Sequence, residues 1–346
     1  QSPQTLQIPV FESQQDASLA RRLHTQLPNN PSCPKTSWGL RLTRVFDMSR
    51  DAQLFCTHNQ LQSRGGRLAG NRITLPTGEV WVSVLEGKMV DMLDHRAADI
   101  QLQPKNVHRP QQPKRLTDAE KQDPNREARP YLWCPLAVAR RRAPPWKKSW
   151  IGVAKRVTSV TNARTLRVAV IPWGEIALSY TLYAITCAQD HQQYASGLVA
   201  CMCSLVTDYL VRQKTTQTSL TVGVMKQVPM LPPKTWTSAC PWNPTQTMAA
   251  WARPILAELV FTGEATRGFA CDLGFDQEKP FVWQAQRHAE LAADLDAGLM
   301  AFLKLSSDEV VHILKAFPGL HRRDHRQFGH ALSFEKVREM HAQRVK

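Results

Sequence analysis

Residues 151–171 read IGVAKRVTSVTNARTLRVAVI, and the two apolar runs in this stretch decide the fold class. Ile151–Val153 and Thr165–Ile171 are rich in β-branched residues and predict two β-strands. The polar segment 155–164 separates them. Further along, Leu198–Gln213 places apolar residues at helical spacing and predicts an amphipathic helix. Strands and helices therefore mix within one region, which indicates an α+β protein.

The flanks of this region add one more predicted strand and several helices. On the N-terminal side, Val80–Leu85 predicts a strand, and the stretch Ala17–Leu23 has a short amphipathic pattern. On the C-terminal side, Ala285–Leu303 predicts a helix. Ser306 and Glu309 form a capping box for a second helix, which Pro318-Gly319 should end. A final helix is expected from about Ser333.

Composition shifts suggest four ranges. We predict an extended or loosely ordered lead over 1–35, a mixed α/β region over 36–130 that ends in a Pro-rich linker at 101–130, a basic mixed α/β recognition region over 131–257, and a helical C-terminal region over 258–346. Because a mixed region precedes a run of helices, the predicted fold class is α+β with a helical C-terminal tail.

Positive charge is concentrated in one part of the chain. The 346 residues carry 44 Lys and Arg against 29 Asp and Glu, a net charge of +15. Residues 131–257 hold 14 of the bases and only three acids, and the segments 128–174 and 209–257 contain no acid. A basic field confined to one region is typical of proteins that bind a polyanion, since each neutralised phosphate releases counterions. The alternative is a solvated surface that only aids solubility.

Several function classes find no support in the sequence. No phosphate-binding loop, dinucleotide fingerprint, zinc-protease motif or nucleophile elbow is present. The base-gripping tetrapeptide of amino methyltransferases is also missing, and Ala143-Pro144-Pro145-Trp146 lacks its acidic or amide residue. The eight cysteines include no C-x-x-C pair, and Cys201 and Cys203 are expected to be core thiols in a reduced cytoplasm. No apolar run is long enough for a membrane span, and no signal peptide is visible. We therefore expect no metal and no catalytic residue.

Two short motifs have an open role. Glu86-Gly87-Lys88 fits half of a metal-dependent nuclease site, in which Asp47 or Asp91 would supply a second metal ligand. Asp94-His95-Arg96 is either a proton relay or a salt-bridged structural turn.

Three series of short blocks follow one another in order over residues 36–341. The N-terminal blocks are Trp38-Gly39-x-Arg41, Phe46-Asp47-Met48, Leu54-Phe55, Leu68-x-Gly70-Asn71-Arg72, Leu85-Glu86-Gly87-Lys88-Met89 and Asp94-His95-Arg96. The middle blocks are Trp150-Ile151-Gly152, Arg156-x-Thr158, Thr161-Asn162-Ala163-Arg164-Thr165, Val170-Ile171-Pro172, 204–214 and 226–233. The tail blocks are 293–297, Ser307-Asp308-Glu309, Phe317-Pro318, Arg323-Asp324 and Phe328-Gly329. Together these blocks resemble the C-terminal half of large adenine-specific DNA methyltransferases, which occur in type IIG restriction–modification and in the DISARM and BREX phage-defence systems.

The resemblance implies sequence-specific recognition of double-stranded DNA for a catalytic domain that methylates adenine N6. That domain, or subunit, would bind S-adenosylmethionine, and this chain itself would hold no cofactor. Phosphate contacts are expected from the basic residues Arg140, Arg141, Arg142, Lys147, Lys148 and Lys155. Base or near-base contacts are expected from Arg156, Thr158, Asn162, Arg164, Gln213 and Lys214, and Thr165, Arg212 and Lys226 belong to the same DNA-binding set.

Three hypotheses follow for the function. The first is target recognition for a methyltransferase, with the catalytic domain and other defence-system proteins as partners. The second is a nuclease that uses Glu86 and Lys88. The third is a non-catalytic scaffold of a defence complex. For Arg164 a structural alternative also exists, in which it pairs with Asp208 or Asp190 inside the fold while Gln213 caps the preceding helix.

Overall fold

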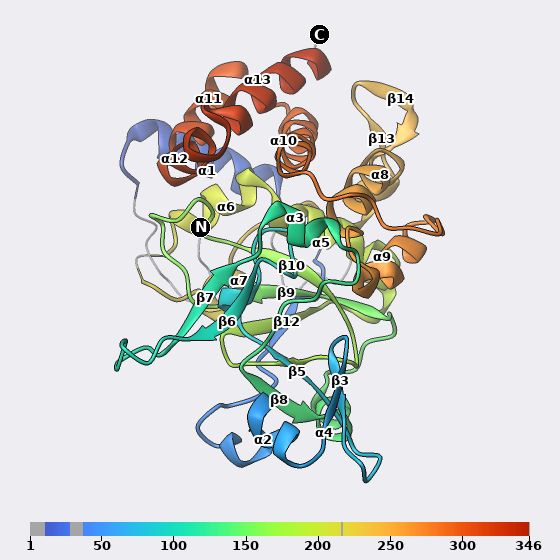
Figure 1. Cartoon of the computed structure of the whole chain (residues 1–346). Helices are drawn as coiled ribbons and strands as arrows, with labels where there is room; N and C mark the ends of the chain where they lie inside the picture. The colour runs from blue at the N-terminus through green and yellow to red at the C-terminus, as the bar shows by residue number, and fades with distance from the viewer. Residues whose placement is uncertain (1–10, 28–36, 216, 346) are drawn as a thin grey trace.

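A central antiparallel sheet organises the chain, for which the computed structural model describes residues 11–27, 37–215 and 217–345 (Figure 1). Its strands are β1 (Arg41–Thr43), β12 (Leu182–Thr186), β9 (Trp150–Lys155) and β10 (Val168–Pro172), in the order β1-β12-β9-β10. The predicted strand at 151–153 is thereby confirmed as β9. The strand predicted at 165–171 is confirmed as β10 from Val168 onward, while residues 165–167 precede it.

Both faces of the central sheet are buried, which explains its continuous apolar runs. Along β10, Val168 and Val170 belong to the larger hydrophobic core, on the helical side. Ala169 and Ile171 belong to a second core that also contains Val84 of the other sheet. Successive side chains of a strand point to opposite faces, so each strand contributes to both cores.

A second sheet packs against the inner face of the first. Its strands are β2 (Cys56–Thr57), β8 (Leu132–Pro135), β5 (Val80–Leu85), β4 (Arg72–Thr74) and β3 (Arg67–Ala69), in that order, and β11 (Ala177–Leu178) pairs with β5 in parallel. The predicted strand at Val80–Leu85 is confirmed in full. Two hairpins complete the strands: β6 (Ala98–Leu102) with β7 (Gln111–Arg115), and β13 (Ala239–Cys240) with β14 (Asn243–Thr247).

Helices cover the other face of the central sheet and form the C-terminal end of the molecule, at the top of Figure 1. The helices before residue 230 are α1 (Gln14–Gln26), α2 (His58–Ser63), α3 (Asp118–Gln122), α4 (Leu136–Arg142), α5 (Ala195–Cys203), α6 (Leu205–Arg212) and α7 (Val222–Lys226). The later helices are α8 (Met248–Val260), α9 (Arg267–Asp272), α10 (Ala285–Phe302), α11 (Ser307–Lys315), α12 (Pro318–Phe328) and α13 (Leu332–Arg344). The α+β class with a helical C-terminal region is confirmed.

One predicted helix needs correction, and one predicted helix end is confirmed. The single helix predicted over Leu198–Gln213 is broken at Ser204, which is extended and caps α6 by accepting a hydrogen bond from the Thr207 amide at 3.1 Å. The segments on either side of the break meet at 59°. Pro318 does end the helix that starts with the Ser306–Glu309 capping box, but it also begins α12, because proline fits the first turn of a helix.

Parts of the first two predicted ranges contain regular structure where a loose segment or a linker was expected. Within the predicted loose lead, residues 14–26 form α1, which buries Leu19 and Leu23 and is held by Asp16. Asp16 accepts hydrogen bonds from the Tyr209 hydroxyl at 2.7 Å and from His312 at 2.8 Å. Residues 1–10 and 28–35 of that lead lie outside the described residues. The predicted linker at 101–130 contains β7 and α3, so it is a built part of the fold.

Candidate nucleic-acid interface

A cleft of about 1040 Å³ opens beside the edge strand β1. Its walls come from β1 and the residues before it, from the segment that follows α4, from the end of β12 and from the region around α7. The basic residues among its lining are Arg41, Arg142, Lys147 and Lys226. None of the described lining residues is Asp or Glu. A concave surface with one sign of charge concentrates anions.

The walls of the cleft are held in place by two tryptophans. The indole N–H of Trp146 donates to the carbonyl of Trp150 at 2.6 Å and thereby fixes the segment after α4. The indole N–H of Trp38 donates to the carbonyl of Leu231 at 2.8 Å. Both tryptophans also line the cleft, so two of its lining residues are held in place by hydrogen bonds to the backbone.

The predicted phosphate contacts fall into two groups. Arg141 and Lys147 are exposed and form no ion pair with any described residue. Three others are already engaged: Arg142 bonds buried Asp51 at 2.9 Å, Lys148 bonds Asp272 at 2.6 Å, and the Nε of Arg140 donates to the Gly174 carbonyl at 3.2 Å. Arg141 and Lys147 can therefore bind phosphates at a lower cost in free energy, because they break no internal ion pair in doing so.

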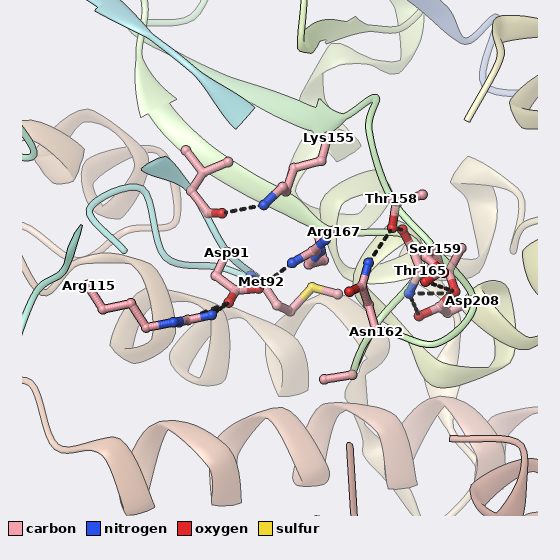
Figure 2. Close-up of polar contacts among 12 residues, drawn as sticks. Asp91, Met92, Arg115, Lys155, Thr158, Ser159, Asn162, Thr165, Arg167 and Asp208 are labelled. Atoms are coloured by element: carbon pink, nitrogen blue, oxygen red, sulfur yellow. Dashed lines mark hydrogen bonds and ion pairs between the residues drawn. The ribbon is translucent and has the colours of Figure 1, made fainter. Parts of the chain in front are cut away.

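Lys155, the last of the predicted phosphate contacts, lies inside the protein (Figure 2). Its ammonium group donates to the Val90 carbonyl at 3.2 Å, and burial lowers its pKa to about 8. Arg167 and Arg115 lie on the neighbouring Asp91, at 3.9 and 3.4 Å. Lys155 itself is thus buried, beside an ion-pair cluster that reaches the surface through Arg115, and its ammonium group does not reach a ligand on the surface.

Three residues of the predicted DNA-binding set have structural roles inside the fold. Arg164 is buried, and its Nη2 lies 2.6 Å from Oδ2 of Asp296. The structural alternative is therefore correct that Arg164 forms an ion pair inside the fold. Its partner is Asp296, however, and not Asp208 or Asp190. The Thr165 amide donates to the buried Asp208 carboxylate at 2.9 Å. Thr158 is also buried and donates to the Thr165 carbonyl at 2.6 Å, as Figure 2 shows. As folded, these three side chains have no access to a base edge.

The other members of the predicted DNA-binding set lie at the end of α6, beside Tyr180 and on α7. Arg212 donates to the Asn162 carbonyl at 2.9 Å and stacks on Phe317, 4.0 Å from the ring centroid. Gln213 occupies the C-cap position of α6, as the structural alternative has it. Lys214 is half-buried, and burial lowers its pKa to about 8. Arg156 is half-buried over Tyr180, with 5.4 Å between its guanidinium carbon and the ring centroid. Lys226 is exposed on α7 at the cleft.

The possible nuclease motif has a structural task. Glu86 and Lys88 form an ion pair at 3.2 Å, and Lys88 also donates to the Gln111 carbonyl at 2.9 Å. Burial raises the pKa of Glu86. Asp47 binds the amides of the turn that follows it and Asp91 binds arginines, so neither joins Glu86. Among the described residues, no group of three or more His, Cys, Asp or Glu side chains is placed to hold a metal.

Asp94-His95-Arg96 is a buried structural turn. Asp94 pairs with Lys121 at 2.5 Å, and the Nε2 of His95 lies 3.6 Å from Glu127. Arg96 is completely buried and donates to four backbone carbonyls, those of Lys121, Asp123, Arg126 and Thr262. Cys201 and Cys203 are buried as expected, and burial raises the pKa of Cys201 to about 12.

No family model, curated protein or solved structure matches the chain. Within the described residues, no single helix is both long and apolar enough to cross a bilayer.

Sequence reasoning missed several exposed cations. Arg41 lines the cleft from the edge strand β1, and Lys105, Arg109 and Lys114 lie on the β6–β7 hairpin. A signal was available, because the sequence from Ile100 to Thr117 contains basic residues and no acid.

Proposed function

We propose that this chain binds duplex DNA and supplies target recognition to an N6-adenine methyltransferase of a restriction–modification or phage-defence system in the cytoplasm. The observation that carries the proposal is the cleft lined by four Lys and Arg residues and by no described acid. Its location agrees with the excess of positive charge over 131–257. The resemblance to the C-terminal half of adenine methyltransferases supports the nature of the partner.

Arg41 and Lys147 carry most of the proposed phosphate binding. Both are exposed, both line the cleft, and neither forms an ion pair with a described residue. Binding phosphate at these positions breaks no internal ion pair, while the release of counterions from DNA favours it. Arg141, at the end of α4, adds a third free charge next to the cleft.

We assign base contacts to Gln189 and Gln192 instead of Arg164. Both line the cleft from the short 3₁₀ turn Gln189–Tyr194 that follows β12. A glutamine amide binds adenine bidentately at N6 and N7 in the major groove. The methyl transfer itself belongs to the catalytic partner, which would hold S-adenosylmethionine.

The proposal is tested by the salt dependence of duplex binding. For the parent chain, the logarithm of the binding constant should fall linearly with the logarithm of salt concentration, with a slope of about −0.9 for each phosphate contact. Arg41→Ala with Lys147→Ala should flatten the slope by about 2 units. The matched control is Lys279→Ala with Lys315→Ala, which removes the same charge from exposed positions outside the cleft.

A second measurement tests specificity. Selection from a randomised duplex pool should enrich one motif that contains adenine, and Gln192→Ala should relax the preference at one base pair by about 1–3 kcal/mol. Equal slopes for the cleft variant and its control, or an unselective pool, would overturn the proposal.

A further inference from the structure

The β6–β7 hairpin is fixed firmly at its base. The Ile100 amide donates to the Arg129 carbonyl at 2.9 Å, and the Leu116 amide donates to the Ala97 carbonyl at 3.1 Å. On the other strand, Lys88 binds the Gln111 carbonyl at 2.9 Å. Both strands are therefore attached to the body of the protein at their base. The hairpin projects from the body in a direction that these bonds fix (Figure 1).

The far end of the hairpin is organised by its own hydrogen bonds. The Gln103 amide donates to the Pro110 carbonyl at 2.6 Å, and the Asn106 amide donates to the Gln103 carbonyl at 2.9 Å. The Gln112 side chain donates to the Arg109 carbonyl at 2.6 Å. Every residue from 101 to 110 is nevertheless exposed. Because these bonds are local, the tip is pre-formed without burying any of its side chains.

The charge of this segment is positive and largely free. Lys105, Arg109 and Lys114 are exposed and form no ion pair with a described residue. Lys114 lies opposite Asp99 in the register, but that carboxylate is already bound by Arg126 at 2.5 Å and by the Arg129 amide at 2.8 Å. Val107 at the tip is 82 % exposed, so an apolar contact point accompanies the cations.

We infer that this hairpin, residues 98–115, is an arm that enters the major groove of duplex DNA as a two-stranded ribbon. The inference rests on the proposed function and adds a contact site separate from the cleft. The major groove admits a two-stranded β-ribbon and is about 8.5 Å deep. The continuously exposed part of the arm, residues 101–110, has about five residues on each side and extends at most about 17 Å, so it is long enough. Lys105 and Arg109 at the tip bind phosphates or guanine edges, and Val107 contacts thymine methyl groups.

The test compares three double variants in the full chain. Lys105→Ala with Arg109→Ala removes the charge of the tip, Arg41→Ala with Lys147→Ala removes the charge of the cleft, and Lys279→Ala with Lys315→Ala is the control. The arm variant should flatten the salt slope of duplex binding by about 2 units. Bound DNA should also show a difference in the protection of guanine N7 from dimethyl sulfate. The arm variant should no longer protect the guanines contacted by the arm, whereas the cleft variant should still protect them.

A shortened arm gives a second, independent measurement. Replacing residues 103–110 with Asn-Gly joins Leu102 to Gln111, which already face each other in the register, through the preferred two-residue turn. This variant should unfold at the temperature of the parent and bind DNA like the arm variant. An arm variant with the parent's slope and footprint would overturn the arm and leave the proposed function intact, provided the cleft variant is impaired. If the parent chain binds no duplex DNA, both the arm and the proposed function are overturned. If the arm binds anionic phosphatidylserine vesicles instead of DNA, only the arm is overturned.

Discussion

Arg164 and Asp296 lie 132 residues apart in the sequence and meet at 2.6 Å, with side chains only 6 % and 3 % exposed. The pair joins the loop before β10 to α10. Asp296 also accepts a hydrogen bond from the Leu205 amide at 2.6 Å, so α6 is attached to the same carboxylate. A sheet loop and two helices thus depend on one buried ion pair.

We expect Arg164→Met to lower the free energy of unfolding by about 3–5 kcal/mol, because it leaves the Asp296 carboxylate buried and unpaired. Urea unfolding measures this loss. Arg164→Met with Asp296→Leu should recover only part of it, since both charges are then gone but the buried Leu205 amide loses its acceptor. Arg141→Ala, an exposed control, should change stability by less than about 0.5 kcal/mol. A stable Arg164→Met variant with altered sequence preference would contradict the structural role.

Arg96 should tolerate no substitution, lysine included. Its guanidinium group donates to four backbone carbonyls, and an ammonium group lacks the planar fork that reaches them together. We expect Arg96→Lys and Arg96→Met to cost on the order of 4 kcal/mol, because buried carbonyls lose their donors. The midpoint of denaturant unfolding is the measurement, and Arg141→Lys is the control. A midpoint for Arg96→Lys within error of the parent would exclude this role.

Gly319 allows α12 to approach the loop 159–164. A Cβ at this position would lie 2.7 Å from the carbonyl carbon and oxygen of Asn162. We expect Gly319→Ala to destabilise the protein by about 1–3 kcal/mol, because the backbone of α12 or of the loop 159–164 has to move to make room for the methyl group. Gly223→Ala in α7 is the matched control, because the nearest atom to its Cβ would be Thr221 Oγ1 at 3.7 Å. Thermal unfolding should show no loss there, and a similar effect of both changes would argue against close approach at Gly319.

His288 should make the fold less stable in mild acid. Burial lowers the pKa of His288 to about 4, against a usual value of 6.5. Its Nε2 is inaccessible to solvent and has no hydrogen-bond partner among the described residues. Between these two pH values the unfolded chain binds a proton that the folded chain does not, so stability falls as pH decreases through that window.

The loss attributed to His288 is about 1–3 kcal/mol between pH 7 and pH 4. His288→Gln should remove this part of the pH dependence in urea unfolding. His330→Gln, at an exposed position, should keep it. If the stability of both variants and of the parent depends on pH in the same way, His288 is solvated in the folded protein and the prediction is wrong.

The sequence allowed the strands to be predicted better than the site. β5, β9 and β10 were found because both of their faces are buried, so most of their positions hold apolar residues, many of them β-branched. The break at Ser204 was missed because the apolar spacing continues through it, and only the extended backbone of that one residue separates α5 from α6. A local pattern cannot show a change of direction that distant packing imposes.

The cations were harder to assign, because a charged residue looks the same in sequence whether it is exposed or buried. Arg164 stands in an acid-free segment, yet its partner comes from α10. The arm was mistaken for a linker because of its prolines. Pro104 and Pro110 lie beyond the paired strands, and Pro113 lies in a two-stranded ribbon, where proline is tolerated at an edge.

The attachment of α1 sets an order on the biosynthesis of this protein. Asp16 takes its hydrogen bonds from Tyr209 and His312, and β1 pairs with β12. Because α1 precedes these partners in the chain, it has its final contacts only after residue 312 has left the ribosome. At about 5–20 residues per second, the helix waits for roughly 15–60 s, with the apolar side of Leu19 and Leu23 uncovered. During synthesis, this face is a natural place for a chaperone to bind.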